Sequence, residues 1–259
     1  MTQTTLDGSS FAAVAVALLQ EHEPPEGYYL AFSGGKDSIV CYDLLQKSGV
    51  KFDAHYNMTT IDPPELTAFI RRHYPDVHWH KPMYKGKRTN FYRLIETKGL
   101  PNRWVRWCCS VLKEGGGAKR TVVVGVRAAE SVKRSKYAIY EPKHNDSNTY
   151  LLRPILRWET SDVWDYIRAN ELPYCELYDR GWDRIGCIMC PLACIRKRHM
   201  DMLRYPAVYR AICRAVGVYI KNHPETSLLK WGNTPEEIVY MWIAETPATD
   251  ETGQCQFTG

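Results

Sequence analysis

The six residues SGGKDS combine the residue types that bind phosphate. They follow the apolar run 28–32 and precede the helical periodicity of 39–46. Two glycines after a buried strand let the backbone approach a ligand closely, and the N–H groups that begin the next helix face an anion. Lysine adds positive charge, and the two serine hydroxyls add donors. The residues predicted to bind nucleotide phosphates are Ser33, Gly34, Gly35, Lys36, Asp37 and Ser38.

Two commoner phosphate motifs do not fit this turn. The pattern G-x-x-x-x-G-K-[ST] requires glycine where Leu30 stands and a hydroxyl residue where Asp37 stands. The dinucleotide fingerprint requires G-x-G-x-x-G, which is absent here. The turn therefore indicates a different class of nucleotide-binding protein.

Four of the nine cysteines form two close pairs, with 77 residues between the pairs. Cys108 and Cys109 are adjacent, whereas Cys187 and Cys190 form a C-x-x-C pair. The side chains of two adjacent cysteines diverge, so such a pair suits a tetrahedral zinc ion poorly. A 4Fe–4S cube is larger and has separate iron corners, which thiolates from two segments can reach. The four thiols are predicted metal ligands. A Cys₄ zinc site is the alternative, and disulfides are disfavoured in an intracellular chain.

Further polar residues follow two predicted strands. Arg127 directly follows the β-branched run 121–126, and its planar guanidinium suits phosphate or sulfonate oxygens. Glu130 and Ser131 are expected to orient this arginine or to bind ribose. Asp62 is a candidate ligand of ribose or Mg²⁺. Alternatively, Arg127 is a surface residue at a strand end, and Asp62 caps a helix.

Two basic stretches leave nucleic acid open as a partner. They are 132–136 (VKRSK) and 194–199 (CIRKRH). Such stretches grip a nucleic-acid backbone, but they also occur as solvated helix faces or close on nucleotide phosphates. The formal net charge of +5 fits an anionic substrate such as an adenine nucleotide.

The positions of these residues require an α/β fold. Strands expected at 28–32, 51–56, 77–80 and 121–126 alternate with helices, which predicts a doubly wound, mostly parallel sheet with ligands beyond the carboxyl strand ends. Further helices are expected at 160–170, capped by Thr160 or Ser161, at 199–221 and at 235–245.

The expected organisation has four parts. Residues 1–26 contain an N-terminal helix that starts near Ser9 or Ser10, and residues 27–157 form the nucleotide-binding domain. Residues 158–246 form a cluster-binding helical extension, and residues 247–259 form a mobile tail. The apolar stretch 11–19 lacks a preceding Lys or Arg and is therefore not expected to be a signal peptide. No run approaches the roughly 20 apolar residues of a membrane span, so a cytoplasmic protein is predicted.

Several motifs together resemble one protein family. SGGKDS resembles the pyrophosphate-binding loop of the N-type ATP pyrophosphatases, in the adenine nucleotide alpha-hydrolase (HUP-type) superfamily. The segment 153–191, RPILRWETSDVWDYIRANELPYCELYDRGWDRIGCIMCP, and the segment 125–134, GVRAAESVKR, resemble the phosphoadenosine phosphosulfate (PAPS) reductase family of that superfamily. The matched segments span about 28–198.

The cysteine pattern is similar to one subtype of this family. CC followed by C-x-x-C resembles the 4Fe–4S motif of adenosine phosphosulfate (APS) reductases and of the DNA phosphorothioation sulfurtransferase. The resemblance implies a 4Fe–4S cluster on Cys108, Cys109, Cys187 and Cys190. It also implies ATP with Mg²⁺, or PAPS or APS, as the nucleotide.

The intact loop favours ATP cleavage over sulfonucleotide reduction. PAPS and APS carry no β,γ-diphosphate, and their reductases usually have a degenerate loop. The reductases also use a cysteine in a C-terminal E-C-G-x-H-like motif. The chain ends in DETGQCQFTG, so Cys255 lacks the glycine and histidine that follow. Cys255 and Cys194 remain candidate catalytic cysteines.

Three functions are therefore expected, in this order. The first is an ATP-dependent sulfurtransferase that releases pyrophosphate, which requires a sulfur donor protein. The second is a PAPS or APS reductase, which requires a thioredoxin-like reductant and releases sulfite. The third is a nucleotide-binding regulator with a structural cluster and no turnover. A homo-oligomer is left open.

Overall fold

A computed structural model of the chain describes residues 10–144 and 146–244. They divide into two compact units. Among the described residues, the first comprises 10–57, 64–80 and 115–185, and the second comprises 58–63, 81–114 and 186–244. The units thus interleave along the chain, whereas the sequence suggested one boundary near 157. Packing between distant segments, rather than chain order, decides which segments share a core.

The first unit is built on a six-stranded sheet. Its strands are β1 (Tyr28–Ala31), β2 (Phe52–Asn57), β3 (His78–His80), β6 (Thr121–Val123), β7 (Tyr140–Lys143) and β8 (Asp146–Leu152). Their order is β3-β2-β1-β6-β8-β7, and only β7 runs antiparallel to its neighbour. In the register, Leu30 pairs with Ala54 on one side and with Val123 on the other. The expected mostly parallel sheet is confirmed.

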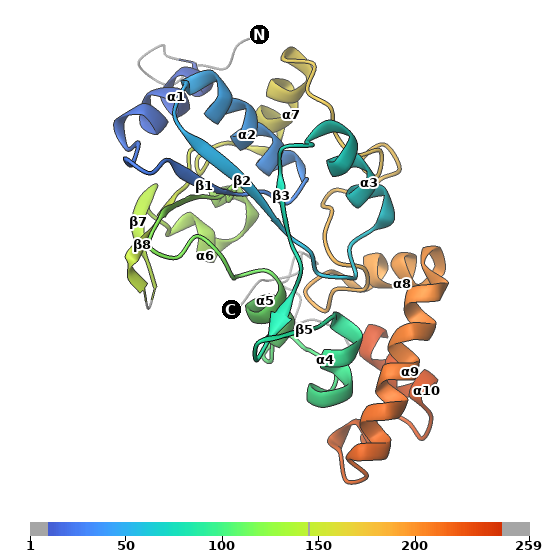
Figure 1. The fold of residues 1–259 in the computed structure, drawn as a ribbon. Helices are drawn as coiled ribbons and strands as arrows, with labels where there is room; N and C mark the ends of the chain where they lie inside the picture. Colours follow the sequence, from blue (N-terminus) through green and yellow to red (C-terminus); the bar gives the residue numbers. More distant parts are fainter. Residues whose placement is uncertain (1–9, 145, 245–259) are drawn as a thin grey trace. The chain divides into compact units, whose positions relative to one another are not determined.

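Helices cover both sides of this sheet. They are α1 (Phe11–Glu21), α2 (Lys36–Ser48), α3 (Pro64–His73), α6 (Val132–Ser135) and α7 (Thr160–Ala169), with a 3₁₀ turn, η1, at Ala128–Glu130. α2 packs against α1 and α7 on one side of the sheet, and α6 lies on the other (Figure 1). Leu30, Leu44 and Val123 are completely buried between these layers.

The predicted N-terminal cap is confirmed for α1 but not for α7. Ser10 caps α1 as expected, because its Oγ accepts a 3.1 Å hydrogen bond from the N–H of Ala13. In α7 the cap is Glu159, which precedes both predicted caps, Thr160 and Ser161. The Asp162 carboxylate accepts a 2.7 Å hydrogen bond from the Glu159 N–H, and the Glu159 side chain accepts one in return. This reciprocal pair makes Glu159 the cap, and the helix begins at Thr160 as expected.

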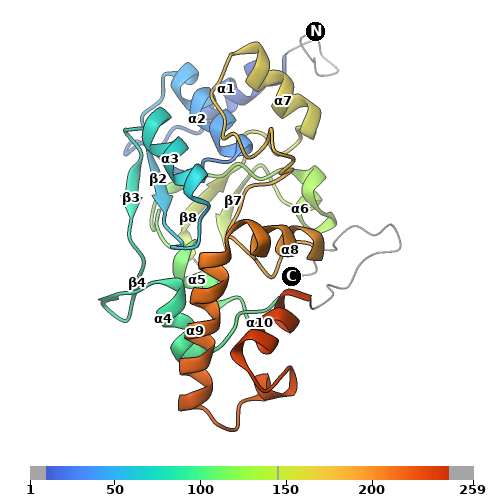
Figure 2. The same cartoon turned by 90° about the vertical axis from the view of Figure 1, so that its right-hand side faces the viewer.

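The second unit is mainly helical. It contains the hairpin β4 (Met83–Tyr84) and β5 (Lys87–Arg88), the helices α4 (Phe91–Lys98), α5 (Trp107–Leu112), α8 (Ile195–Arg204), α9 (Pro206–Asn222) and α10 (Pro235–Ala244), and the 3₁₀ turn η2 (Ser227–Lys230). α9 packs against both α4 and α10 (Figure 2). Their core includes Phe91, Ile212 and Trp242, and the Trp242 indole donates a 2.6 Å hydrogen bond to the Pro101 carbonyl.

The single helix expected over 199–221 is wrong. α8 ends at Arg204, and α9 begins at Pro206. Pro206 has no N–H to continue the ladder of α8, but it suits the first position of a new helix. Within the described residues, no helix has both the length and the apolar character needed to cross a membrane.

Candidate functional site

The predicted phosphate loop lies directly beyond the carboxyl end of β1. The chain turns through Ser33 and Gly34, and α2 begins at Lys36 with Gly35 as its N-terminal cap. Gly34 has φ +69°, and a Cβ there would lie 2.7 Å from the Ile70 side chain in α3. Only glycine fits this conformation and contact. The N–H groups of the first turn of α2 lack helical partners and favour an anion.

Two serine hydroxyls hold the loop together. The Ser38 Oγ lies 3.1 Å from the Ser33 Oγ, donates to the Gly35 carbonyl at 2.8 Å and accepts from the Ser33 N–H at 3.2 Å. Ser38 is buried. These hydrogen bonds fix the curvature of the loop before any ligand arrives.

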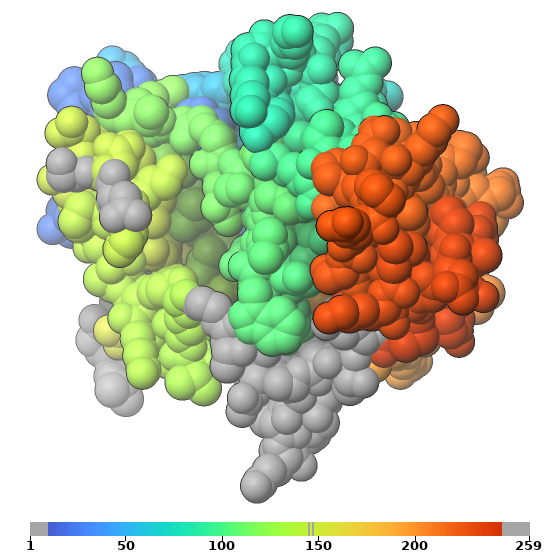
Figure 3. All heavy atoms as spheres, turned by 90° about the horizontal axis from the view of Figure 1, so that it is seen from below, coloured from blue at the N-terminus to red at the C-terminus, as the bar shows by residue number. Residues whose placement is uncertain are grey.

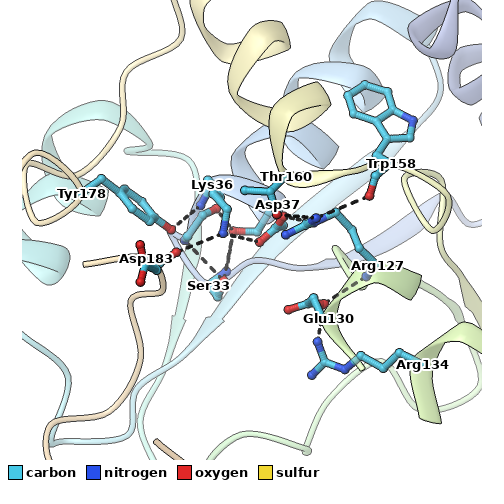
Figure 4. Close-up of polar contacts among 12 residues, drawn as sticks. Ser33, Lys36, Asp37, Arg127, Glu130, Arg134, Trp158, Thr160, Tyr178 and Asp183 are labelled. Carbon is cyan, nitrogen blue, oxygen red and sulfur yellow. Dashed lines mark hydrogen bonds and ion pairs between the residues drawn. The ribbon is translucent and has the colours of Figure 1, made fainter. Parts of the chain in front are cut away.

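Lys36 places its ammonium group inside the site. The residue is only 4% exposed, and its Nζ lies 3.4 Å from the Asp37 carboxylate and 3.3 Å from the carbonyl of Asp183. The backbone N–H of Lys36 donates to the Tyr178 hydroxyl at 2.9 Å (Figure 4). The segment containing Tyr178 and Asp183 therefore supplies oxygen acceptors where phosphate oxygens are expected. Burial raises the pKa of Tyr178, which keeps the phenol neutral.

Arg127 reaches the loop from the segment that follows β6. Its Nε lies 2.6 Å from the Asp37 carboxylate, and its Nη1 donates to the Thr160 hydroxyl at 3.2 Å and to the Trp158 carbonyl at 3.4 Å. Arg127 is 3% exposed. The guanidinium is thus satisfied by protein groups and holds Asp37 in place (Figure 4). In this arrangement it supports the loop from behind.

Glu130 and Ser131 mainly organise the segment around Arg127. The Glu130 carboxylate accepts a 3.0 Å hydrogen bond from the Arg127 N–H and forms an ion pair with Arg134. Burial opposes ionisation of Glu130, but Arg134 and this N–H outweigh burial and keep the pKa of Glu130 below its usual value. The Ser131 hydroxyl caps α6 by accepting from the Arg134 N–H at 3.3 Å.

Asp62 belongs to the second unit. Its carboxylate accepts a 2.8 Å hydrogen bond from the Thr59 N–H, so it stabilises the turn that precedes Pro63. The pKa of Lys113 is raised, chiefly by its electrostatic interaction with Cys187 and also by Asp62. Asp62 is therefore placed beside the cysteine segment of its own unit.

The second unit also brings the four predicted cysteine ligands together. Cys108 and Cys109 lie in α5, and Cys187 and Cys190 lie in the loop before α8. All four are partly exposed. The pKa of Cys108 is raised, chiefly by a hydrogen bond with Cys109 and by burial. Negative charge on Cys109, Cys190 and Cys187 raises it further. Each of the two segments therefore lies within electrostatic reach of the other.

Cationic side chains flank these thiols. A hydrogen bond from the Cys108 thiol, assisted by Arg106, lowers the pKa of Cys109 to about 6. Burial raises the pKa of Cys187 to about 11, although Lys113 opposes this effect. Thiolates, rather than thiols, bind metals. The surroundings therefore favour the thiolate of Cys109, whereas Cys108 and Cys187 would have to lose their protons on binding a metal.

The four thiols have the donor chemistry of a metal site but are not arranged as one. In the described ranges, no group of three or more His, Cys, Asp or Glu residues is arranged to hold one metal ion. Four thiols from two segments with flanking cations nevertheless match the ligand chemistry of a 4Fe–4S cluster, whose iron corners are separate. The residues are thus chemically compatible with a cluster.

Of the two candidate catalytic cysteines, only Cys194 belongs to the described residues. Cys194 is exposed and is the residue before α8. Cys255 lies outside the described residues. The Cys194 carbonyl accepts a 3.1 Å hydrogen bond from the Arg198 N–H. Among the described residues, none that could act as a ligand or base is hydrogen-bonded to the Cys194 thiol.

Three important side chains were not singled out from the sequence. Tyr178 and Thr160 complete the hydrogen bonds of the phosphate loop and of Arg127. Asp201 of α8 is 1% exposed and accepts a 2.9 Å hydrogen bond from the Met189 N–H, which anchors the C-x-x-C loop. The only signal for Tyr178 was its place in the LYD part of the family-like segment.

Comparisons with known proteins identify the family of this chain. A sequence model of the phosphoadenosine phosphosulfate reductase domain matches residues 27–193. "Uncharacterized protein MJ0973" of Methanocaldococcus jannaschii is 35% identical over 63% of this chain and 41% of that protein. The adenosine 5'-phosphosulfate reductase of Oceanobacillus iheyensis is 30% identical over 62% of this chain and 69% of that protein.

A solved structure supports the fold. The phosphoadenylyl-sulfate reductase of Candida auris, solved as a phosphate complex, has a TM-score of 0.51 and 19% identity, covering 71% of this chain and 96% of that one. The chain spans about two fifths of the length of the first two curated relatives that it matches. Because the domain match extends over more than half of the residues, the chain belongs to the phosphoadenosine phosphosulfate reductase family of nucleotide-acting enzymes.

Proposed function

We propose that this protein binds ATP with Mg²⁺ at the Ser33–Ser38 loop and activates an acceptor for sulfur insertion. An acceptor oxygen attacks the α-phosphorus of ATP, the bond to the bridging oxygen of the β-phosphate breaks, and pyrophosphate leaves. A sulfide-level sulfur from a donor protein then displaces AMP from the activated acceptor.

One observation carries this proposal. The loop has two glycines, a buried lysine and the first turn of α2 at the carboxyl end of β1, with the Lys36 N–H bonded to the Tyr178 hydroxyl. A lysine ammonium and helix N–H groups stabilise charge on a departing pyrophosphate. A sulfonucleotide reductase has no such leaving group to hold.

The cysteines of the second unit add a second element. Cys108, Cys109, Cys187 and Cys190 would hold a 4Fe–4S cluster, which supplies electron-transfer or sulfur-binding chemistry when bound. Arg106 and Lys113 would stabilise the thiolate ligands, as their effects on the pKa values of Cys109 and Cys187 indicate. Cys194 and Cys255 remain the candidate catalytic cysteines.

The second candidate function is sulfonucleotide reduction. The Oceanobacillus iheyensis relative, named adenosine 5'-phosphosulfate reductase, favours it. In this reaction a cysteine thiolate attacks the sulfonyl sulfur of APS or PAPS, the nucleotide leaves, and a thioredoxin-like dithiol later reduces the product to release sulfite. Cys255 is the nearest counterpart of such a cysteine by sequence position.

Two product assays separate these functions. Protein purified without oxygen is incubated with ATP, Mg²⁺, a sulfide source and candidate acceptors, and pyrophosphate is measured. A parallel sample receives APS or PAPS with thioredoxin, and sulfite is measured. We expect acceptor-dependent pyrophosphate and no sulfite. Sulfite release without ATP binding would reject the first function and establish the second.

A further inference from the structure

Positive charge is concentrated in one continuous segment of the second unit. Residues 81–114 contain nine Lys or Arg residues and only two Glu, a net charge of +7, whereas the whole chain carries +5. The rest of the chain is therefore slightly acidic. A segment with such an excess is the electrostatic signature of a polyanion-binding surface.

The hairpin of β4 and β5 presents part of this charge. Its turn uses Lys85 and Gly86, both with positive φ, and Tyr84 pairs with Lys87 across the hairpin. Lys98 of α4 places its Nζ 4.7 Å from the centre of the Tyr84 ring, and the Nζ of Lys85 lies 5.6 Å from the same point. A hydrogen bond from Lys98 lowers the pKa of Tyr84. Two lysine ammonium groups thus lie near one aromatic ring, and Lys87 is the residue paired with Tyr84 across the hairpin.

These cations are not neutralised by the protein. In the described part of the chain, none of Lys85, Lys87 and Arg88 forms a salt bridge with a carboxylate, and all three are exposed. Unpaired lysines held close together repel one another, so an external polyanion would relieve this repulsion. The hairpin and the residues after it lie on the surface as the teal-to-green part of Figure 3.

An exposed aromatic turn follows in the same segment. Trp104 is 81% exposed, and Val105 beside it is 56% exposed. The Asn102 side chain accepts hydrogen bonds from the N–H groups of both residues, at 2.9 and 2.6 Å, so the turn holds the indole outward. The turn leads into α5, which packs against β4. A large exposed indole is a platform on which a base can stack.

Part of the charge of the two basic stretches first considered from the sequence is bound within the protein. In α8, Arg198 is 1% exposed and donates to the Trp242 carbonyl at 3.0 Å, and Lys197 forms a 2.6 Å salt bridge with Asp201. In the other stretch, Arg134 is paired with Glu130. Lys133, Lys136 and Arg196 remain exposed, but neither stretch has a positive charge as large as that of residues 81–114.

We infer that the surface formed by the β4–β5 hairpin, Lys98 and the Trp104 turn binds single-stranded nucleic acid. The lysines and Arg88 contact phosphates, and Trp104 stacks on an unpaired base. An unpaired strand is favoured over a duplex because stacking on Trp104 requires an accessible base face. This inference does not depend on ATP cleavage, so either can fail without the other.

The test is fluorescence anisotropy with the full chain. Labelled oligo-dT and oligo-U of about 20 nucleotides are titrated at several salt concentrations, and the two arms decide between DNA and RNA. The triple variant Lys85→Gln/Lys87→Gln/Arg88→Gln should weaken binding about tenfold or more at low salt. It should also reduce the slope of log K against log salt by about 2, because each single-strand phosphate contact contributes about 0.7.

A matched triple variant controls for net charge. Lys133→Gln/Lys136→Gln/Arg157→Gln removes three exposed positive charges elsewhere and should leave the affinity within about twofold. Trp104→Ala should weaken binding about fivefold or more without changing the salt slope, whereas Tyr240→Ala, at another exposed aromatic residue of the second unit, should not. Circular dichroism checks that each variant folds.

Three outcomes would overturn the inference. The first is the lack of any binding to either oligonucleotide at about 50 mM salt. The second is an equal loss of affinity in both triple variants, which would indicate nonspecific attraction. The third is equal affinity for a blunt duplex of the same length, which would exclude stacking on an unpaired base.

Discussion

The guanidinium Nε of Arg127 lies 2.6 Å from the carboxylate of Asp37, and both side chains are largely buried. This contact connects the segment after β6 to the first turn of α2. Gly125 makes the approach feasible, because a Cβ at that position would lie 2.8 Å from the backbone of Asp37. The phosphate loop is therefore braced by an ion pair that lies behind it.

The ion pair predicts a large loss of stability when Asp37 is removed. Asp37→Ala leaves the buried Arg127 charge uncompensated, which should lower the free energy of unfolding by about 3–5 kcal/mol. Urea denaturation followed by circular dichroism measures this change. The exposed pair Asp165–Arg168 provides the control, since Asp165→Ala should cost less than about 1 kcal/mol. Equal effects of the two substitutions would show that the Arg127 contact is not special.

Lys36 is predicted to be essential for the chemical step. Lys36→Met keeps much of the buried side-chain volume but removes the charge that faces the phosphates. If the proposed function holds, kcat/KM for pyrophosphate release should fall about a hundredfold or more. Lys51→Met, at an exposed lysine just before β2, should keep near-normal activity. Unchanged turnover in Lys36→Met would contradict the role given to the loop.

Tyr178 is predicted to compete with the nucleotide. Its hydroxyl accepts the hydrogen bond of the Lys36 N–H, which would otherwise face a phosphate. Tyr178→Phe removes this acceptor and should tighten ATP binding by about two- to fivefold. Isothermal titration calorimetry measures the affinity, with Tyr174→Phe as the control. Weaker binding in Tyr178→Phe would instead mean that the hydroxyl contacts the nucleotide itself.

The cysteine set predicts a defined metal content. Anaerobically purified protein should contain about four irons and four acid-labile sulfides per chain. Serine at Cys108, Cys109, Cys187 or Cys190 should reduce this content strongly, whereas Cys194→Ser should retain it. Iron and sulfide analysis gives the result. One zinc ion per chain, with neither iron nor sulfide, would establish the alternative Cys₄ zinc site.

Asp53 predicts a pH-dependent contribution to stability. The Arg120 Nη1 donates to its carboxylate at 2.8 Å, and this side-chain hydrogen bonding is the main cause that lowers the pKa of Asp53 from 3.8 to about 2. A carboxyl whose pKa falls on folding stabilises the protein above its unfolded pKa and loses that effect as the pH drops through the folded value. Stability from Asp53 is therefore complete above about pH 4 and lost toward pH 2.

The corresponding variant is Asp53→Asn. Because Asp53 is partly exposed, it should reduce the free energy of unfolding by only about 1 kcal/mol near neutral pH. The difference from the unsubstituted protein should narrow as the pH falls below about 4. Denaturation curves at several pH values measure it. Asp76→Asn, at an exposed carboxylate, should show no such trend, and a pH-independent difference for Asp53→Asn would refute the electrostatic explanation.

The sequence by itself determined the local elements and the ligand types. Glycine-rich SGGKDS after an apolar run identified β1, the turn and α2, because backbone conformation there depends on neighbouring residues. The alternation of strands and helices predicted the mostly parallel sheet. The spacing of four cysteines nominated a metal site without reference to their positions in space.

Only the tertiary structure decided how distant residues are used. Arg127, predicted at a strand end to contact phosphate, is buried against Asp37, and Tyr178 supplies an acceptor to α2 from far along the chain. The basic stretch of α8 is internally bonded, whereas the hairpin lysines of residues 81–114 remain exposed. Such pairings depend on long-range packing, and side-chain chemistry alone does not specify which charged groups will meet.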